Sequence, residues 1–219
     1  IAGPGVLHTD ITYLRGAQEE IWHRLLQLQF APNPFDVLSW MLAHGAEPVV
    51  KAYGGDTRAG LNAARAGAQA ITRWTNNLRH SLRLSPGHIN FFSAIKRAAI
   101  TEYKRADQQN TLFVSAGLCP VTPLEDQGES LWFGGRRFHT IEQPVHGCSR
   151  IIRGRDFTTS FPVSEAEIGP VTATLDGGCG FANGILNLGL VQPSGEVRVV
   201  GRWTLPEEIA TQSPIALSA

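Results

Sequence analysis

The sequence predicts an α/β fold in which helices come first along the chain and strands follow. Apolar residues in the first half recur every three or four positions, which is the period of an amphipathic helix. In the second half, short β-rich runs are separated by Gly, Asn and Ser, which is typical of strands and turns. We expect one domain over residues 1–219, with a helical part over about 17–105 and a strand-rich part over about 110–204.

The helical segments are predicted from apolar spacing and from residues that start or end helices. Asn33 and Pro34 form a typical start, because Asn caps the first turn and Pro fits the first helical position. Gly45 is well placed to end that helix. The other predicted helices cover residues 19–30, 58–84 and 88–103.

The strands are predicted from short runs of apolar and β-branched residues bounded by turn residues. The first such run lies near the amino terminus, and the others lie in the second half of the chain. The predicted strands are residues 11–14, Thr111–Val114, Arg150–Arg153, 171–175, 185–190 and 196–203.

Composition limits the classes of protein that the chain can belong to. Its 219 residues are 42% hydrophobic and 17% charged, which is enough apolar material for a sizeable core. Nineteen Lys and Arg balance nineteen Asp and Glu, so the basic excess of a nucleic-acid binder is missing. No apolar run reaches the ~18 residues that a membrane span needs. We therefore expect neither a nucleic-acid partner nor a membrane span.

The cysteines and the amino terminus indicate a cytoplasmic protein. Three widely spaced cysteines, without a CxxC pair, suggest neither a disulfide framework nor a zinc site. The first residues, IAGP, lack the basic and apolar regions of a signal peptide. The chain does not begin with Met, which is expected of a processed or trimmed product or of part of a longer protein.

Few residues carry a recognisable chemical pattern by themselves. None of the seven histidines forms HxH, HExxH or another metal-binding spacing. The glycine-rich stretch DGGCG at residues 176–180 follows a predicted strand. It could bind an anion through backbone N–H groups, but a tight turn between strands is the favoured interpretation. Cys179 could act as a nucleophile only beside a base that lowers its pKa, and no such partner is evident.

Three short stretches resemble the motifs of one enzyme family, the calcineurin-like metallophosphoesterases of the serine/threonine-phosphatase type, in their bacterial form. LRGAQE at residues 14–19 resembles the RGNHE motif of that family. LFVSAG at residues 112–117 resembles its LFVHAG strand, and IRGRD at residues 152–156 resembles its late RGHD motif. All three occur in the family's order and spacing.

Further stretches extend the resemblance over nearly the whole chain. PLEDQ at residues 123–127 with Trp132 following, and LDGGCGF at residues 175–181, match the later part of the family pattern. YGGD at residues 53–56 resembles the bacterial members. The resemblance implies a metallophosphoesterase-like β-sandwich flanked by helices.

The departures from the family pattern fall on its functional positions. The resemblance puts Ala17 in the place of a metal-ligand Asn and Gln18 in the place of the catalytic His. Ser115 and Arg155 stand where the family has two further metal-ligand histidines. Residues that neighbour these positions remain as in the family: Arg15, Gly16, Glu19, Gly117, Gly154 and Asp156.

Two earlier family motifs, GDxHG and GDxVDRG, do not occur in this chain. They supply the remaining metal ligands and lie on the family's first β-α-β unit. We expect that this unit is missing from the fold, having been lost or lying upstream of Ile1.

The substitutions predict a protein without bound metal or other cofactor. The family uses two metal ions about 3.5–4 Å apart to activate water and to hold the phosphoryl oxygens. Ala17 offers no donor atom and Ser115 is a poor ligand. The guanidinium of Arg155 cannot coordinate a cation and would repel one. We therefore expect a catalytically inactive homologue that acts as a structural or protein-binding subunit of a larger assembly.

Two alternative functions remain open from the sequence. In the first, Arg15, Arg153 and Arg155 bind phosphate oxygens, which would make the protein a metal-free sensor of phosphate or nucleotide. The competing interpretation of Arg155 is an ion pair with Asp156 or another carboxylate that fills the former metal site. In the second, the protein is an active enzyme, either a phosphoesterase or one that uses Cys179 or Asp176 as nucleophile.

Overall fold

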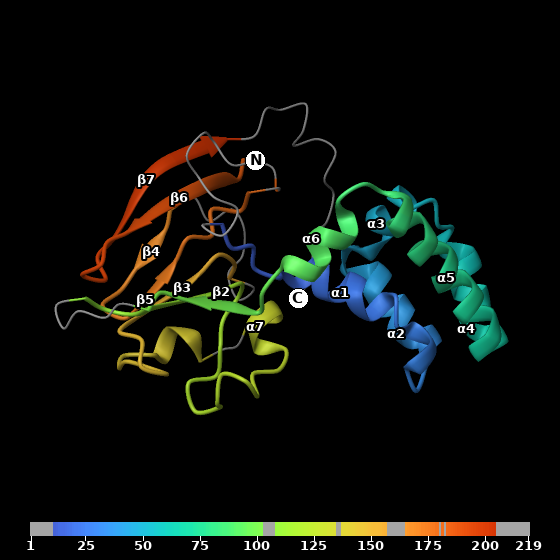
Figure 1. Cartoon of the computed structure of the whole chain (residues 1–219), viewed down its shortest axis with the longest axis horizontal. Coiled ribbons are helices and arrows are strands. Elements are labelled where there is room, and N and C mark those ends of the chain that lie inside the picture. Colours follow the sequence, from blue (N-terminus) through green and yellow to red (C-terminus); the bar gives the residue numbers. More distant parts are fainter. Residues whose placement is uncertain are drawn as a thin grey trace. The chain divides into compact units, whose positions relative to one another are not determined.

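The computed structural model describes residues 11–102, 108–134, 137–156, 165–179, 181 and 183–204. These residues form two compact units. The helical unit spans Ala17–Ile95, and the strand-rich unit consists of residues 11–16 and 96–204 (Figure 1).

The helical unit is made of short helices around a core of buried apolar side chains. Its elements are α1 (Ala17–Leu25), η2 (Leu28–Phe30), α2 (Pro34–Met41), the π-helical turn η3 (Leu42–Ala46), α3 (Glu47–Ala52), α4 (Thr57–Ala66), α5 (Ala68–Leu84) and α6 (His88–Ala94). The almost completely buried side chains of this unit include Ile21, Trp22, Leu25, Leu28, Leu38, Met41, Val50, Ile71 and Leu78.

The predicted start of α2 is confirmed. The Asn33 side chain accepts a hydrogen bond from the backbone N–H of Asp36 at 3.3 Å, and Pro34 is the first helical residue. Gly45, predicted to end this helix, has φ 97°, which interrupts the helical backbone between α2 and α3. Glycine adopts a positive φ without the steric cost that a Cβ would bring, so a glycine is the expected residue at this break.

The single helix predicted over residues 58–84 is wrong, because Gly67 divides it. α4 begins at the cap Asp56, whose carboxylate accepts from the N–H groups of Arg58 and Ala59 at 2.8 and 3.2 Å. It ends at Gly67, which has φ 104° and ψ −179°, and α5 starts at the next residue. A lone glycine in a helical pattern is often tolerated, so the break is weakly signalled by sequence.

The helix predicted over residues 88–103 is too long. α6 ends at Ala94, and the chain then forms the strand β1 (Ala98–Ile100). Ile95 has extended backbone angles, φ −62° and ψ 139°, and ends the helix. Tyr103 lies outside the described residues.

The strand-rich unit contains a mixed five-stranded sheet and a separate hairpin. β2 (Thr111–Val114), β3 (Arg150–Arg153) and β5 (Thr172–Thr174) are parallel neighbours. β1 and β4 (Glu167–Ile168) pair antiparallel at the two edges, which gives the order β1-β2-β3-β5-β4. β6 (Ile185–Val191) and β7 (Val197–Thr204) form the antiparallel hairpin.

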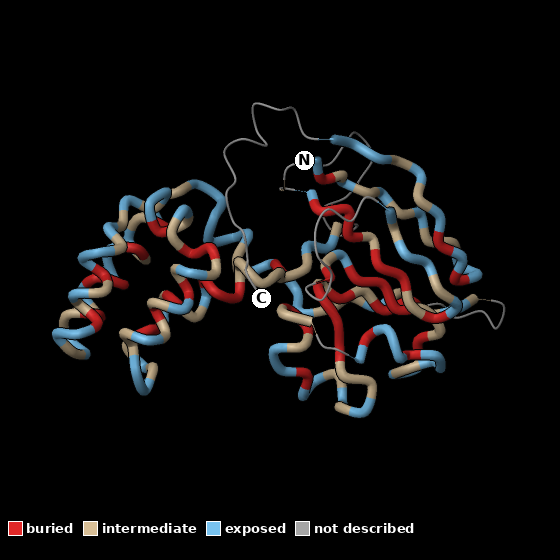
Figure 2. The backbone as a smooth tube through the Cα atoms, turned by 180° about the vertical axis from the view of Figure 1, so that it is seen from behind, coloured by how far each residue is buried: buried red, intermediate tan, exposed pale blue. Residues whose placement is uncertain are grey.

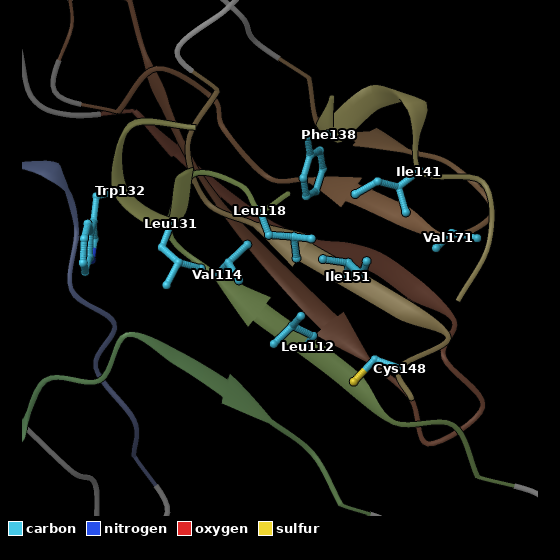
Figure 3. Close-up of a cluster of buried hydrophobic side chains, with 10 residues drawn as sticks. All are labelled: Leu112, Val114, Leu118, Leu131, Trp132, Phe138, Ile141, Cys148, Ile151 and Val171. Atoms are coloured by element: carbon cyan, nitrogen blue, oxygen red, sulfur yellow. The ribbon is translucent and has the colours of Figure 1, made fainter. Parts of the chain in front are cut away.

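The two faces of the five-stranded sheet are buried by different layers. One face packs against the segment with α7 (Ser130–Phe133) and η4 (Phe138–Thr140), and the hairpin covers the other (Figure 1). The larger core is drawn in Figure 3 and consists of Leu112, Val114, Leu118, Leu131, Trp132, Phe138, Ile141, Cys148, Ile151 and Val171. The core beneath the hairpin consists of Ile152, Ala173 and Val197, with Phe113, Leu175 and Val191 against it.

The α/β class is confirmed, and a metallophosphoesterase-like arrangement of the layers stays a prediction. Five of the six predicted strands correspond to β2, β3, β5, β6 and β7. The run over residues 11–14 forms only an isolated bridge, between Leu14 and Lys96. Within the described residues, no helix has the length and apolar character needed to cross a membrane.

Replacing Gly67 by Ala tests whether its backbone conformation limits stability. A Cβ at Gly67 would meet no atom within 4 Å, so only the strain of φ 104° opposes it. We expect Gly67→Ala to lower the free energy of unfolding by about 1–3 kcal/mol, measured by urea denaturation. Gly128→Ala is the matched control: its Cβ also meets nothing within 4 Å and its φ is outside the positive region. Equal stability of the two variants would contradict the prediction.

Candidate functional site

A pocket of about 420 Å³ lies where the parallel strands of the larger sheet end. β2 and β3 are in register, with Val114 opposite Arg153, so the residues that follow them leave the sheet at the same edge. The lining residues come from these strand ends, from the residue after β5 and from the bridge at Leu14: Leu14, Phe113, Val114, Ser115, Ile152, Arg153, Gly154, Arg155 and Leu175.

Two of the positions that the family resemblance singles out are neighbours in this pocket. The Ser115 carbonyl accepts from the backbone N–H groups of Gly154 at 3.0 Å and of Arg155 at 2.9 Å. These bonds extend the contact between β2 and β3 beyond the last paired residues. Ser115 and Arg155 are therefore brought together by the parallel pairing of the strands that precede them.

Arg155 is held by a buried carboxylate. Its Nη1 donates to Oδ2 of Asp176 at 2.9 Å, and its guanidinium lies over the Phe181 ring at 5.2 Å from the centroid. Asp176 is only 6% exposed. Its Oδ2 also accepts from the Asp156 N–H at 2.9 Å, and its Oδ1 accepts from the Gly178 N–H at 2.9 Å. One carboxylate therefore joins the end of β3 to the turn that follows β5.

A second ion pair lies beside the first and is completely buried. Arg153 Nη2 donates to Oδ2 of Asp156 at 2.6 Å, and Nε donates to Oγ1 of Thr174 at 2.8 Å. Its Nη1 donates to the Ala116 carbonyl at 3.4 Å, and its guanidinium stacks 4.2 Å from the centroid of Phe138. All three guanidinium nitrogens of Arg153 donate hydrogen bonds within the protein, so this side chain has a structural role.

Burial lowers the pKa of both guanidinium groups. For Arg155 the nearby carboxylates, chiefly Asp176 and then Asp156, act in the opposite direction. For Arg153 burial is again the largest cause, opposed first by Asp156 and then by Glu167 and Asp176. A guanidinium stays charged at any working pH, so each of these buried cations needs its carboxylate partner.

The other predicted site residues have structural surroundings. Ala17 and Gln18 begin α1 in the helical unit, and Gln18 Nε2 donates to the His44 carbonyl at 2.9 Å. Arg15 is half-buried and its backbone N–H donates to the Lys96 carbonyl at 2.8 Å. Of the three arginines considered as anion ligands, Arg153 and Arg155 line the pocket, and each has a carboxylate partner.

The donor set of the pocket does not fit a metal site. Ser115 offers one neutral hydroxyl, and Arg155 offers a cation in place of a ligand. Among the described residues, no group of three or more His, Cys, Asp or Glu side chains could hold a metal ion. The phosphoryl chemistry of the resembled family therefore has no support in these side chains.

The glycine-rich stretch forms a close turn. Gly177 accepts from the Ile185 N–H at 2.7 Å, and a Cβ at Gly177 would lie 2.2 Å from the Ile185 carbonyl oxygen. The N–H of Gly178 is used by Asp176, which removes it as an anion donor. Asp176 accepts three donors, and the Cys179 side chain is exposed. Gly180 lies outside the described residues.

Three residues of the charge network escaped sequence reasoning. Thr174 accepts from Arg153, Phe138 stacks on it, and His139 Nε2 lies 3.2 Å from Arg153 Nη2 and 3.4 Å from Asp156 Oδ2. Each is distant in sequence from Arg153 and follows no motif. The sequence signal was that Arg153 and Arg155 are both cations near a predicted strand. Cations that become buried need carboxylates close by.

Comparisons with protein-family models, with curated proteins and with solved structures found no match. The functional interpretation therefore depends on the pocket and on the sequence motifs around it.

Replacing Asp176 by Asn tests how strongly the pocket depends on this carboxylate. The amide would lose the negative charge and turn one acceptor into a donor that faces other donors. Arg155 is 21% exposed, so water relieves part of the loss, and we expect the free energy of unfolding to fall by about 2–4 kcal/mol.

Glu196→Gln is the matched control for this variant. It removes the carboxylate of an exposed pair with Arg198, and we expect a change below about 0.5 kcal/mol. A urea titration that gives both variants the stability of the wild type would overturn the role assigned to Asp176.

Proposed function

We propose that the chain is a catalytically inactive relative of the calcineurin-like metallophosphoesterases that acts as a structural or protein-binding subunit of a larger assembly. The observation that carries the proposal is the ion pair of Arg155 with Asp176 in the pocket that Ser115 also lines. Ser115 and Arg155 are the positions to which the motifs assign two metal-ligand histidines.

The physical reason is electrostatic. A metallophosphoesterase pocket needs anionic and neutral donors around two cations. In this chain a guanidinium that is permanently charged occupies the pocket wall and satisfies the Asp176 carboxylate. The Arg155 guanidinium therefore holds the Asp176 carboxylate in place, as a metal ion would in the resembled family. It supplies no open coordination position and activates no water.

The family-like residues that remain have structural roles. Asp156 holds the buried Arg153, and its N–H binds Asp176. Gln127 is almost completely buried and bonds the backbone of Cys119 through both its amide oxygen, at 2.8 Å, and its amide nitrogen, at 2.6 Å. Asp56 caps α4. Retention of residues that maintain the fold, with substitution of those that carry the chemistry, supports a binding role.

Metal content and phosphatase activity test this proposal together. We expect purified protein incubated with manganese and then desalted to hold no stoichiometric metal, because the pocket lacks donors. We also expect no turnover of p-nitrophenyl phosphate above the buffer rate. Stoichiometric manganese with metal-dependent turnover would contradict the proposal, provided that Arg155→Ala changes the rate. Turnover that Arg155→Ala leaves unchanged identifies a contaminating phosphatase.

A metal-free phosphate or nucleotide sensor is the second candidate, because Arg155 and Ser115 line one open pocket. Phosphate would have to compete with Asp176 for the guanidinium. We expect no saturable heat on calorimetric titration with inorganic phosphate or with a nucleotide. Saturable binding that is lost in Arg155→Ala and kept in Arg198→Ala, an exposed arginine elsewhere, would favour the sensor over the structural subunit.

A further inference from the structure

The helix α5 buries one apolar face in the helical unit and exposes a polar face to solvent. Figure 2 shows buried and exposed residues alternating along the helices of this unit. The buried residues of α5 are Ile71, Trp74, Thr75, Leu78 and Leu82. The exposed polar residues of the opposite face are Gln69, Arg73, Asn76, Asn77, His80 and Arg83. Because these six residues recur every three or four positions, they form one continuous outward stripe along the helix.

The outward stripe lies in a part of the chain that has no acidic residue. Residues 57–95, which include α4, α5 and α6, contain five arginines and no Asp or Glu. The carboxylates of the helical unit all precede residue 57, and two of them are paired there: Glu20 with Arg24, and Glu47 with Lys51. The zero net charge, from which we expected no nucleic-acid partner, therefore conceals a local excess of positive charge.

Two arginines of the outward stripe point their charge toward solvent. Arg73 and Arg83 are both exposed, and they lie about 15 Å apart along the axis at ~1.5 Å per residue. Arg79 is instead held inside the unit, where it donates to Oδ1 of Asn76 at 2.6 Å and to the Leu26 carbonyl. Burial lowers the pKa of Arg79, and the charge of Arg83 lowers it further. The cations of α5 therefore act on one another as like charges.

We propose that the outward stripe of α5 binds the phosphodiester backbone of a duplex nucleic acid, independently of base sequence. The planar guanidinium groups of Arg73 and Arg83 match the oxygens of a phosphate and can bind them in pairs. The amides of Asn76 and Asn77 add neutral hydrogen-bonding groups, which commonly contact the phosphate and sugar. A duplex carries one negative charge per about 1.7 Å of its axis, so a straight helix about 25 Å long meets a dense array of phosphates.

The burial of α5 favours a nucleic acid over an anionic lipid surface. A helix that lies in a membrane interface inserts its apolar face among the lipid chains. In α5 that face is already used by the core, where Ile71 is 0% and Leu78 is 1% exposed. Leu84 at the end of α5 is 69% exposed, and α6 exposes Ile89 and Phe91, so the experiment below includes a lipid surface as the alternative. The inference goes beyond the proposed function and does not depend on the loss of metal ligands.

Fluorescence anisotropy of a short labelled DNA duplex of mixed sequence, titrated with the full chain, tests the proposal. The double variant Arg73→Gln/Arg83→Gln removes both exposed arginines of the outward stripe. Arg198→Gln/Arg202→Gln is the matched control, because it makes the same change of net charge at two exposed arginines of β7.

For the wild type we expect saturable binding at low salt, with a slope of log K against log salt of about −2 or steeper, since each neutralised phosphate contributes about −0.9. The stripe variant is expected to weaken binding at least about tenfold and to make the slope shallower by about 2. The control is expected to keep the affinity and slope of the wild type. Circular dichroism of both variants is expected to match the wild type.

Arginine modification by phenylglyoxal tests the wild type without any substitution. The bound duplex is expected to protect Arg73 and Arg83 and to leave Arg198 reactive, read by mass spectrometry of peptides. Absence of saturable binding at low salt, equal weakening by the two double variants, or equal protection of all three arginines overturns the proposal. Tighter binding to phosphatidylserine vesicles than to the duplex, lost in Leu84→Ser, assigns this face to a lipid surface and also overturns it.

Discussion

The strand-rich unit depends on the charge of one buried carboxylate. Asp176 accepts hydrogen bonds from Arg155, from the N–H of Asp156 and from the N–H of Gly178. A carboxylate that is removed from water needs such donors, since an unsatisfied buried charge is far more costly than any single contact. These bonds connect the end of β3, the end of β5 and the turn toward β6. Asp176 therefore links these three segments of the strand-rich unit.

The charged side chains around the pocket form two ion pairs. Arg153, Arg155 and Asp156 lie at the end of β3, and Asp176 follows β5. Each cation has its own carboxylate: Arg153 pairs with Asp156, and Arg155 pairs with Asp176. Such pairs add little net stability compared with apolar packing, but removing one partner leaves the other charge buried and unpaired. Under the proposed scaffold role, the contribution of these pairs would be to fix one local arrangement of the strands.

Much of the fold was predictable because local pattern and burial agree. Thr111–Val114 is a mostly apolar run, and Arg150–Arg153 contains two adjacent isoleucines; both became central strands buried on two faces. β1 and β4 are only three and two residues long, too short for periodicity to detect. The exposed leucines of β6 could not be foreseen either. An alternating strand has two faces, and sequence alone does not say which of them a partner layer will cover.

The site was predictable in its positions and not in its contacts. The motifs drew attention to Ser115 and Arg155, and the parallel pairing of β2 with β3 brings them together. The pair of Arg155 with Asp176 joins residues 21 apart in sequence, and it forms because β5 is the neighbour of β3 in the sheet. Strand order is a property of the whole fold, so no local pattern around Arg155 could have identified its partner.

The most direct test of this account is a double-mutant cycle between Arg155→Met and Asp176→Asn, read by urea unfolding. We expect the double variant to lose less free energy of unfolding than the two single variants lose in sum, by about 1 kcal/mol or more, because each partner depends on the other. Changes that add within about 0.5 kcal/mol would contradict it, since Arg155 and Asp176 would then be independent side chains and the pocket would not be organised by their charge pair.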